Sequence, residues 1–310
     1  MFSSFFGKTK PINYIVLSVF LLLFYATHVF FVVDGNIKEV VLPLEILTFG
    51  ALLLSIFIIN QIVRTEKVTD FNSYAMLFYV LLLVTFSESL TDKNAIFTNF
   101  FLLLAIWRLL SIKSVRNVKH KIFDGSILVA VASLFVDWAL VFLILVLLVI
   151  NVYDRKNFKN WLVPIVGMVT LFILTFTMLK IYDGLSFFEE HYQFSMAFLN
   201  FEAFRAMITP KLVAYLVLMF VVMFFVFMRA RRVGGGKLIV LRIVFFVFLL
   251  GLAINLFRTG DTSPILITFF PAAVFLANYL EGITKPRLQE LVISLCIIAP
   301  LLLFVLELSG

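Results

Sequence analysis

The chain has 310 residues, of which 63% are hydrophobic and 14% are charged, with a formal net charge of +7. Soluble domains average roughly 45–50% apolar and about 25% charged residues, so this composition excludes a water-soluble globular protein and favours an all-α polytopic membrane protein. The basic excess is typical of contact with anionic lipid headgroups, not of nucleic-acid binding. The single cysteine, Cys296, excludes an intramolecular disulfide, and no His or Cys pattern has metal-ligand spacing. We therefore expect neither a metal nor a cofactor.

Apolar stretches follow one another along nearly the whole chain, so we interpret residues 1–310 as a single membrane domain. A membrane-spanning helix needs roughly 20 mostly apolar residues. The sequence predicts eleven spans with these approximate bounds: 12–33, 42–63, 71–87, 95–112, 122–136, 138–152, 161–181, 211–228, 238–254, 264–280 and 288–306.

The basic residues predict the orientation of these spans. With the N-terminus inside, 17 Lys and Arg residues lie in cytoplasmic segments and 6 in outer segments. Basic loops stay preferentially in the cytoplasm, so we predict a cytoplasmic N-terminus and an external C-terminus. The outer six are Lys38, Lys93, Lys180, Arg205, Lys211 and Arg258.

The apolar stretch 122–152 has basic flanks on both sides, KSVRNVKHK before it and DRKNFKN after it. Both flanks are predicted in the cytoplasm, which requires an even number of crossings. We interpret the stretch as a short helical hairpin that turns at Asp137 and Trp138. Each arm of about 15 residues spans only ~22 Å, so Asp137 should face protein or a water-filled cleft. The alternative is one tilted helix with Asp137 buried in it.

A second feature of the predicted outer side is the segment 186–208. Ser186 and Glu189 have the spacing of a capping box, and apolar residues then recur at helical spacing from Phe194 to Ile208. The pattern predicts an amphipathic helix along the outer membrane surface, with either a functional role or only that of closing the bundle.

Two short motifs mark connections between spans. Thr209 and Pro210 predict a helix cap and first turn. Gly234-Gly235-Gly236-Lys237 lacks the full spacing and the preceding strand of a phosphate loop, so we interpret it as a flexible cytoplasmic turn.

Carboxylates gather on the predicted outer side, which holds 12 of the 18 acidic residues. Carboxylates at membrane depth cost a few kcal/mol unless they are paired or hydrated, so the asymmetry predicts a polar cavity that opens outward. The candidate catalytic residues are Asp34 after the first span, Glu45 near the start of the second, and Asp137 at the hairpin apex. A carboxylate in such a place can act as a general base.

Four further residues are candidates for substrate binding. Arg258 and Asp261 lie in the outer loop between the ninth and tenth spans, and His191 and Arg205 lie in the predicted surface helix. The planar fork of an Arg suits phosphate, so the set suits a polyprenyl-phosphate-linked or other lipid-linked substrate. Each site also has a structural interpretation: a turn at Asp34, a hydrated helix start at Glu45, and an ion pair within the Arg258–Asp261 loop.

Three segments carry a resemblance to known proteins: FFGKTKPINY, IFDGSILVAVASLFVDWALVFLILVLLVI and ITFFPAAVFLANYLE. Together they resemble an uncharacterised family of Bacteroidota integral membrane proteins, which implies a bacterial inner (cytoplasmic) membrane. The positions of Asp34, the hairpin and Arg258 are also faintly similar to those in polytopic glycosyltransferases and glycan polymerases. That likeness implies polyprenyl-linked sugars as substrates.

Three functions therefore stay open. The first is an enzyme or carrier-lipid binding protein on the outer face of the membrane. The second is a non-catalytic membrane subunit of an envelope complex for secretion, motility or translocation. A transporter is the third and weakest, because inverted repeats usually mark transporters and no clear internal repeat is evident.

Overall fold

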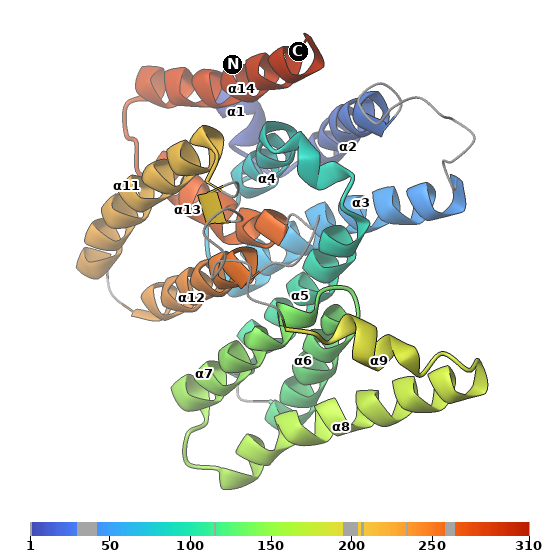
Figure 1. Ribbon diagram of the computed structural model, residues 1–310. Helices are drawn as coiled ribbons and strands as arrows, with labels where there is room; N and C mark the ends of the chain where they lie inside the picture. The colour runs from blue at the N-terminus through green and yellow to red at the C-terminus, as the bar shows by residue number, and fades with distance from the viewer. Residues whose placement is uncertain are drawn as a thin grey trace.

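The computed structural model describes residues 2–29, 42–114, 116–194, 204–205, 208–233, 235–257 and 264–309. These residues form helices joined by turns, and no strand occurs among them (Figure 1). The prediction of an all-α protein is therefore confirmed.

Seven helical segments of the described chain are long and apolar enough to cross a membrane. They are α3 (Leu42–Glu66), α5 (Lys93–Leu110) with the 3₁₀ helix η3 (Ser111–Ser114), α8 (Phe158–Ile181), α11 (Pro210–Val233), α12 (Gly235–Phe257), η6 (Pro264–Thr268) with α13 (Phe269–Glu281), and α14 (Pro286–Ser309). Three shorter apolar segments accompany them: α2 (Pro11–Thr27), α4 (Tyr74–Thr85), and η4 (Asp137–Phe142) with α7 (Leu143–Tyr153). Together with α6 (Val118–Ser133) they overlap every predicted span, which indicates a polytopic membrane protein.

Helix α4 lies at the centre of the bundle, in contact with α2, α3, α13 and α14 (Figure 1). All of its residues from Tyr74 to Val84 are buried, as expected for a helix that is apolar on every side. Its 12 residues rise only about 18 Å, less than the ~30 Å hydrocarbon core. The short length is tolerated because other helices, not lipid, surround α4. The 3₁₀ helix η2 (Ser87–Leu90) follows after Phe86.

A second group of helices is built on α6, which packs between α5 and α8 (Figure 1). Glycines permit this close approach. A Cβ at Gly125 would lie 2.9 Å from Leu109 Cδ2, and one at Gly167 would lie 2.9 Å from the Cβ of Ser126. Small residues at such crossings bring membrane helices together.

The hairpin predicted over 122–152 is present as two helices, not as one tilted helix. Helix α6 ends at Ser133, Val136 has an extended backbone, and η4 then begins at Asp137. The side chain at the apex faces protein, since Asp137 is buried.

The helix predicted over 186–208 is not continuous. Helix α9 covers Ser186–His191, residues 192–194 are not helical, and Phe194 has a positive φ of 45°. Residues 204 and 205 are helical, whereas 195–203 and 206–207 lie outside the described residues. The capping box is not formed either, because the helix begins at Ser186 itself and no side chain caps it. The chain leaves the helix because Tyr192 bonds to Ser133 at the end of α6 and Phe194 bonds to Asp137 at the hairpin apex.

The start of the chain is bound to the last helix. Helix α1 (Phe2–Phe6) lies against α14, and the backbone N–H groups of Phe2 and Ser3 donate to the Glu290 carboxylate at 2.7 and 2.9 Å (Figure 1). Glu290 therefore caps α1.

Ion pairs gather at two ends of the bundle. Each of the five between described residues joins segments that the sequence predicts on the same side of the membrane. The pairs at the end we call outer are Lys93–Glu45 and Lys211–Glu88; those at the inner end are Arg108–Asp124, Lys237–Asp70 and Lys237–Glu281.

Candidate functional site

Glu45, a predicted catalytic residue, is held by two partners. Its Oε1 lies 2.5 Å from Lys93 Nζ, and its Oε2 accepts a hydrogen bond from the Tyr25 hydroxyl at 2.5 Å. The two partners fix the position of the carboxylate. With this geometry, Glu45 is better suited to link α2, α3 and α5 as a structural residue, a strut between them, than to act as a free general base.

Asp137, the second predicted catalytic residue, organises the hairpin apex. Its Oδ1 accepts the backbone N–H of Trp138 at 2.7 Å, and its Oδ2 accepts that of Phe194 at 3.1 Å. The Trp138 ring packs against Phe194 and Phe257. The carboxylate therefore joins the hairpin to the segment after α9.

His191 belongs to the same cluster. Its Nε2 lies 2.8 Å from the carbonyl oxygen of Ser133, the last residue of α6. A carbonyl only accepts hydrogen bonds, so Nε2 carries the proton and satisfies an open helix-end carbonyl. The Ser133 hydroxyl donates to Ala130, so the Tyr192 hydroxyl, 3.1 Å away, donates to Ser133. Burial raises the pKa of Tyr192 above its ordinary value, which keeps that proton in place.

The structure thus brings Asp137 and His191 together but leaves Glu45 in a different cluster. No hydrogen bond or ion pair between described residues joins the two. Arg205 is exposed, and its carbonyl accepts the N–H of Ile208 at 3.3 Å. Asp34, Arg258 and Asp261 lie outside the described residues.

A groove of about 840 Å³ lies between α11 and α14, and we call it the outer groove. Helix α11 packs on α13 and α14 packs on α4, so α13 and α4 lie between the two walls (Figure 1). Its volume is within the ~300–1,000 Å³ of small-molecule sites. Its lining residues are Phe78, Leu81, Leu82, Thr85, Phe86, Glu88, Thr209, Pro210, Lys211, Ala214, Tyr215, Leu218, Leu276, Leu295, Cys296, Ala299, Pro300 and Leu303.

Small residues and one proline open this groove. Ala214 on one wall and Ala299 on the other leave the space that larger side chains would fill. Pro300, inside α14, cannot donate to the carbonyl of Cys296. The Cys296 carbonyl therefore lacks its usual donor in the helix.

One end of the outer groove carries charge. Lys211 Nζ lies 3.2 Å from Glu88 Oε1 and 5.2 Å from the centre of the Phe86 ring. The Lys211 side chain is 18% exposed, whereas that of Glu88 is 65% exposed. Lys211 also stands in the first turn of the 24-residue helix α11, where the helix dipole is positive. Thr209 caps this helix, since its Oγ1 accepts the N–H of Leu212 at 3.1 Å, as predicted.

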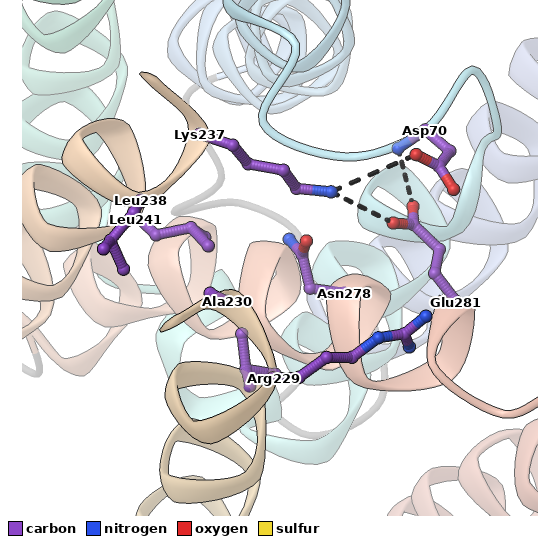
Figure 2. A pocket seen from close by; sticks show the side chains of 9 residues that line it. Asp70, Arg229, Ala230, Lys237, Leu238, Leu241, Asn278 and Glu281 are labelled. Atoms are coloured by element: carbon purple, nitrogen blue, oxygen red, sulfur yellow. Dashed lines mark hydrogen bonds and ion pairs between the residues drawn. The ribbon is translucent and has the colours of Figure 1, made fainter. Parts of the chain in front are cut away.

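A second polar site lies at the inner end, where Lys237 reaches towards two carboxylates (Figure 2). Its Nζ is 3.8 Å from Glu281 Oε2 and 4.0 Å from Asp70 Oδ1. Glu281 is largely buried, with 8% of its side chain exposed, whereas Asp70 is 78% exposed. Lys237 belongs to the first turn of α12, which begins at Gly235, so the turn predicted over 234–237 is wrong for residues 235–237. Gly234 lies outside the described residues.

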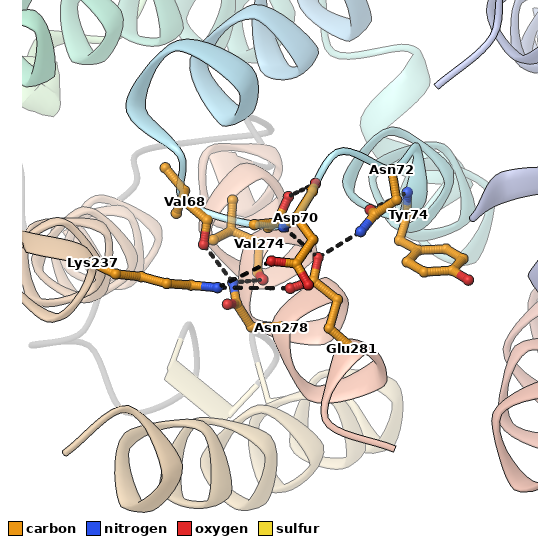
Figure 3. A network of polar contacts seen from close by, with 9 residues as sticks. Val68, Asp70, Asn72, Tyr74, Lys237, Val274, Asn278 and Glu281 are labelled. Carbon is orange, nitrogen blue, oxygen red and sulfur yellow. Dashed lines mark hydrogen bonds and ion pairs between the residues drawn. The ribbon is translucent and has the colours of Figure 1, made fainter. Parts of the chain in front are cut away.

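The turn between α3 and α4 is tied to α13 in the same site (Figure 3). Glu281 Oε1 accepts the N–H of Asp70 at 2.9 Å and the Asn72 amide at 2.6 Å. Asn278 Nδ2 donates to the carbonyls of Val68, at 3.2 Å, and Val274, at 2.9 Å.

Two adjoining hollows open beside this network, with volumes of about 160 and 300 Å³. They share Val226, Arg229 and Asn278, and we call them together the inner hollow. The first is lined by Lys237, Asp70 and Glu281, and the second by Phe225, Tyr279, Gly282 and Ile283.

A family comparison covers almost the whole chain. The profile of DUF6427, a family of unknown function, matches residues 5–309. The chain belongs to this family. No curated protein and no solved structure matches the chain. The resemblance to an uncharacterised family is confirmed, whereas the likeness to glycosyltransferases and the Bacteroidota origin stay predictions.

Neither hollow of this DUF6427 chain was predicted from the sequence. In the sequence, Lys211 reads only as an outer charge and Lys237 only as part of a turn. Pro300 within an apolar span was one available signal for the groove, because a helix proline leaves a carbonyl without its donor. Glu281 beside Asn278 in a predicted span end was a signal for the inner site.

Proposed function

We propose that this protein binds a membrane lipid with a phosphate-bearing headgroup, such as a polyprenyl-phosphate-linked substrate, in the outer groove. One observation carries the proposal: an apolar groove of about 840 Å³ ends at Lys211. An amphiphile needs this combination, with apolar walls for the chain and a cation for the head.

The charge at the groove end is suited to exchange with a ligand. Lys211 is mostly buried, so a good part of its hydration is lost and it needs an anion nearby. Its partner Glu88 is largely exposed and loses little when it returns to water. A lipid phosphate offers more acceptor oxygens than one carboxylate.

The proposal includes the topology predicted from the sequence: eleven crossings, a cytoplasmic N-terminus and an inner-membrane location. The grouping of the ion pairs at two ends of the bundle supports the alternating direction of the helices. In that topology Lys211 lies at the outer face, where carrier lipids present their headgroups.

We assign no chemical step to the site. Glu45 and Asp137 are occupied by structural partners, and neither lines the outer groove. The proposed role is therefore binding and presentation of the lipid.

Cys296 provides the test, because it is the only cysteine of the chain and lines the outer groove. The delipidated protein in mild detergent is treated with an apolar maleimide, and the labelling rate is measured by mass spectrometry. Added polyprenyl phosphate is expected to slow the labelling, whereas the corresponding polyprenyl alcohol is expected to do so much less.

Lys211→Gln should weaken the protection by polyprenyl phosphate, and Lys180→Gln is the matched control. Lys180 is an exposed cation at the end of α8, predicted on the same side, and it does not line the groove. The proposal would be contradicted if polyprenyl phosphate protected Cys296 equally in Lys211→Gln and Lys180→Gln. It would also be contradicted if the alcohol protected Cys296 as well as the phosphate does.

The second candidate function, a non-catalytic subunit of an envelope complex, is supported by α8. This helix packs mainly on α6 and leaves a long apolar face exposed, which includes Ile165, Val169, Phe172 and Ile173. Purification in mild detergent, followed by protein mass spectrometry, would favour this candidate if a second protein were recovered in fixed ratio.

A further inference from the structure

The guanidinium of Arg229 in the inner hollow lies directly against a glycine. Arg229 extends from α11 so that its guanidinium covers Gly282, just after α13 (Figure 2). A Cβ at Gly282 would overlap Arg229 Nη1. Gly282 has an ordinary φ of −69°, so the backbone does not require glycine there. The absence of a side chain is what admits the guanidinium.

Arg229 makes no hydrogen bond or ion pair with any residue in the described part of the chain. A guanidinium carries five N–H donors in a planar fork that matches the oxygens of a phosphate. Apolar residues border it in the second hollow, namely Phe225, Tyr279 and Ile283. No acidic residue lines that second hollow.

Hydrogen-bond acceptors of Glu281, Asn278 and Asp70 line the first hollow, on the other side of Arg229. Among the described residues, the one ion-pair partner of Glu281 Oε2 is the Lys237 ammonium, at 3.8 Å, which is beyond hydrogen-bonding distance. Asn278 uses its amide nitrogen for two carbonyls, so its Oδ1 is left as an acceptor without a donor among the described residues. Asp70 and Glu281 together outnumber the one charge of Lys237, so this side has an excess of negative charge.

The inner hollow therefore has a positive part and a negative part side by side. We propose that it binds a zwitterionic phosphoethanolamine headgroup, with the phosphate on Arg229 and the primary ammonium at Glu281, Asp70 and Asn278. A quaternary choline group has no N–H to donate, so the acceptors would select the primary amine against it.

The source of the headgroup is expected to be a phospholipid of the leaflet at this end. Arg229 lies 18 residues after Lys211 on α11, hence about 27 Å along the helix axis. This separation approaches the ~30 Å thickness of the hydrocarbon core. The site thus faces the opposite leaflet from the outer groove and does not depend on it. The exposed Phe225 ring provides a wall for the acyl chains.

The test measures lipid affinity by thermal stabilisation of the delipidated full-length protein in mild detergent. Short-chain phosphatidylethanolamine, phosphatidylcholine and phosphatidylglycerol are titrated separately, and soluble phosphoethanolamine forms a fourth arm. Phosphatidylethanolamine is expected to stabilise the protein at the lowest concentration. Equal effects of the three lipids would overturn the headgroup assignment.

Arg229→Gln should weaken phosphatidylethanolamine binding about ten-fold or more, the loss expected for one charge-assisted hydrogen bond. Arg231→Gln, an exposed neighbour on the same helix, is the matched control. Because Arg229 is itself exposed, this variant should fold. Equal affinities in the two variants would overturn the phosphate site.

Glu281→Gln should reduce the preference for phosphatidylethanolamine over phosphatidylcholine. If that variant fails to fold, Asp70→Asn replaces it, because the Asp70 side chain is mostly exposed. An unchanged preference would overturn the ammonium site. Protection by soluble phosphoethanolamine as strong as that by the lipid would overturn the lipid source.

Discussion

Lys93 Nζ lies 2.5 Å from Glu45 Oε1, so the first turn of α5 is joined to the first turn of α3. Both side chains are at least two-thirds buried, and Tyr25 of α2 donates to the same carboxylate. A residue that the sequence presents as a candidate base thus connects three helices.

Glu45→Gln should lower the free energy of unfolding by about 1–2 kcal/mol, between the values for exposed and buried ion pairs. The loss is measured by thermal or denaturant unfolding in detergent, followed by tryptophan fluorescence. Glu190→Gln, which changes an exposed carboxylate of α9, is the control and should change stability little. A double-mutant cycle with Lys93→Gln should show coupling; additive effects would argue against the strut.

Asp137→Asn should destabilise the protein by about 1.5–3 kcal/mol, because one backbone N–H loses a charged acceptor. Asp183→Asn is the control, since Asp183 is exposed, has a positive φ of 53°, and Asn tolerates that conformation. The measurement is again unfolding in detergent. Unaltered stability of Asp137→Asn combined with lost function would restore the catalytic interpretation.

Two glycine substitutions should have opposite effects on stability. Gly50 has open space around its absent side chain, so Gly50→Ala should be neutral or stabilise the protein by up to about 1 kcal/mol. A Cβ at Gly251 would lie 3.0 Å from Thr268 Cγ2 and 3.3 Å from Ile267 Cγ2. Gly251→Ala should therefore destabilise the contact of α12 with η6. Melting temperatures of both variants provide the comparison, and equal shifts would show that the two environments do not differ.

Ala299→Phe should fill the outer groove and reduce both lipid protection and basal labelling of Cys296. Ile298→Phe is the matched control, because Ile298 is exposed on the same helix and does not line the groove. The readout is the maleimide labelling rate. If the two variants label alike, the groove is not the route to Cys296.

Gly282→Ala should displace the Arg229 guanidinium and reproduce the weaker lipid binding of Arg229→Gln. The two substitutions are compared by lipid titration, alone and together. The double variant should bind no more weakly than Arg229→Gln, because both act on one contact. Full affinity in Gly282→Ala would mean that the guanidinium binds elsewhere.

Local sequence signals predicted much of the fold. Apolar stretches located the long helices of the bundle, because burial in lipid or protein requires apolar side chains along much of a helix. Thr209 and Pro210 located the start of α11, since a cap acts only on its own first turn. The basic flanks of 122–152 predicted two helices there, and Val136 does interrupt the helix.

The surface helix after Ser186 shows where local patterns fail. Its apolar spacing extended to Ile208, but α9 ends at His191 because partners on α6 and at the hairpin apex bind His191, Tyr192 and Phe194. Those partners lie more than fifty residues away in sequence, beyond the reach of any periodicity.

The sequence by itself determined that this is a helical membrane protein, because composition and apolar run length decide which solvent a helix can face. Only the tertiary structure decided which polar residues meet. Lys211 lies beside Glu88 at the end of an apolar groove, and Arg229 lies against Gly282, because α11 packs against α13. Helix packing depends on shape at every contact along two surfaces, and a charge pattern along one chain does not contain that information.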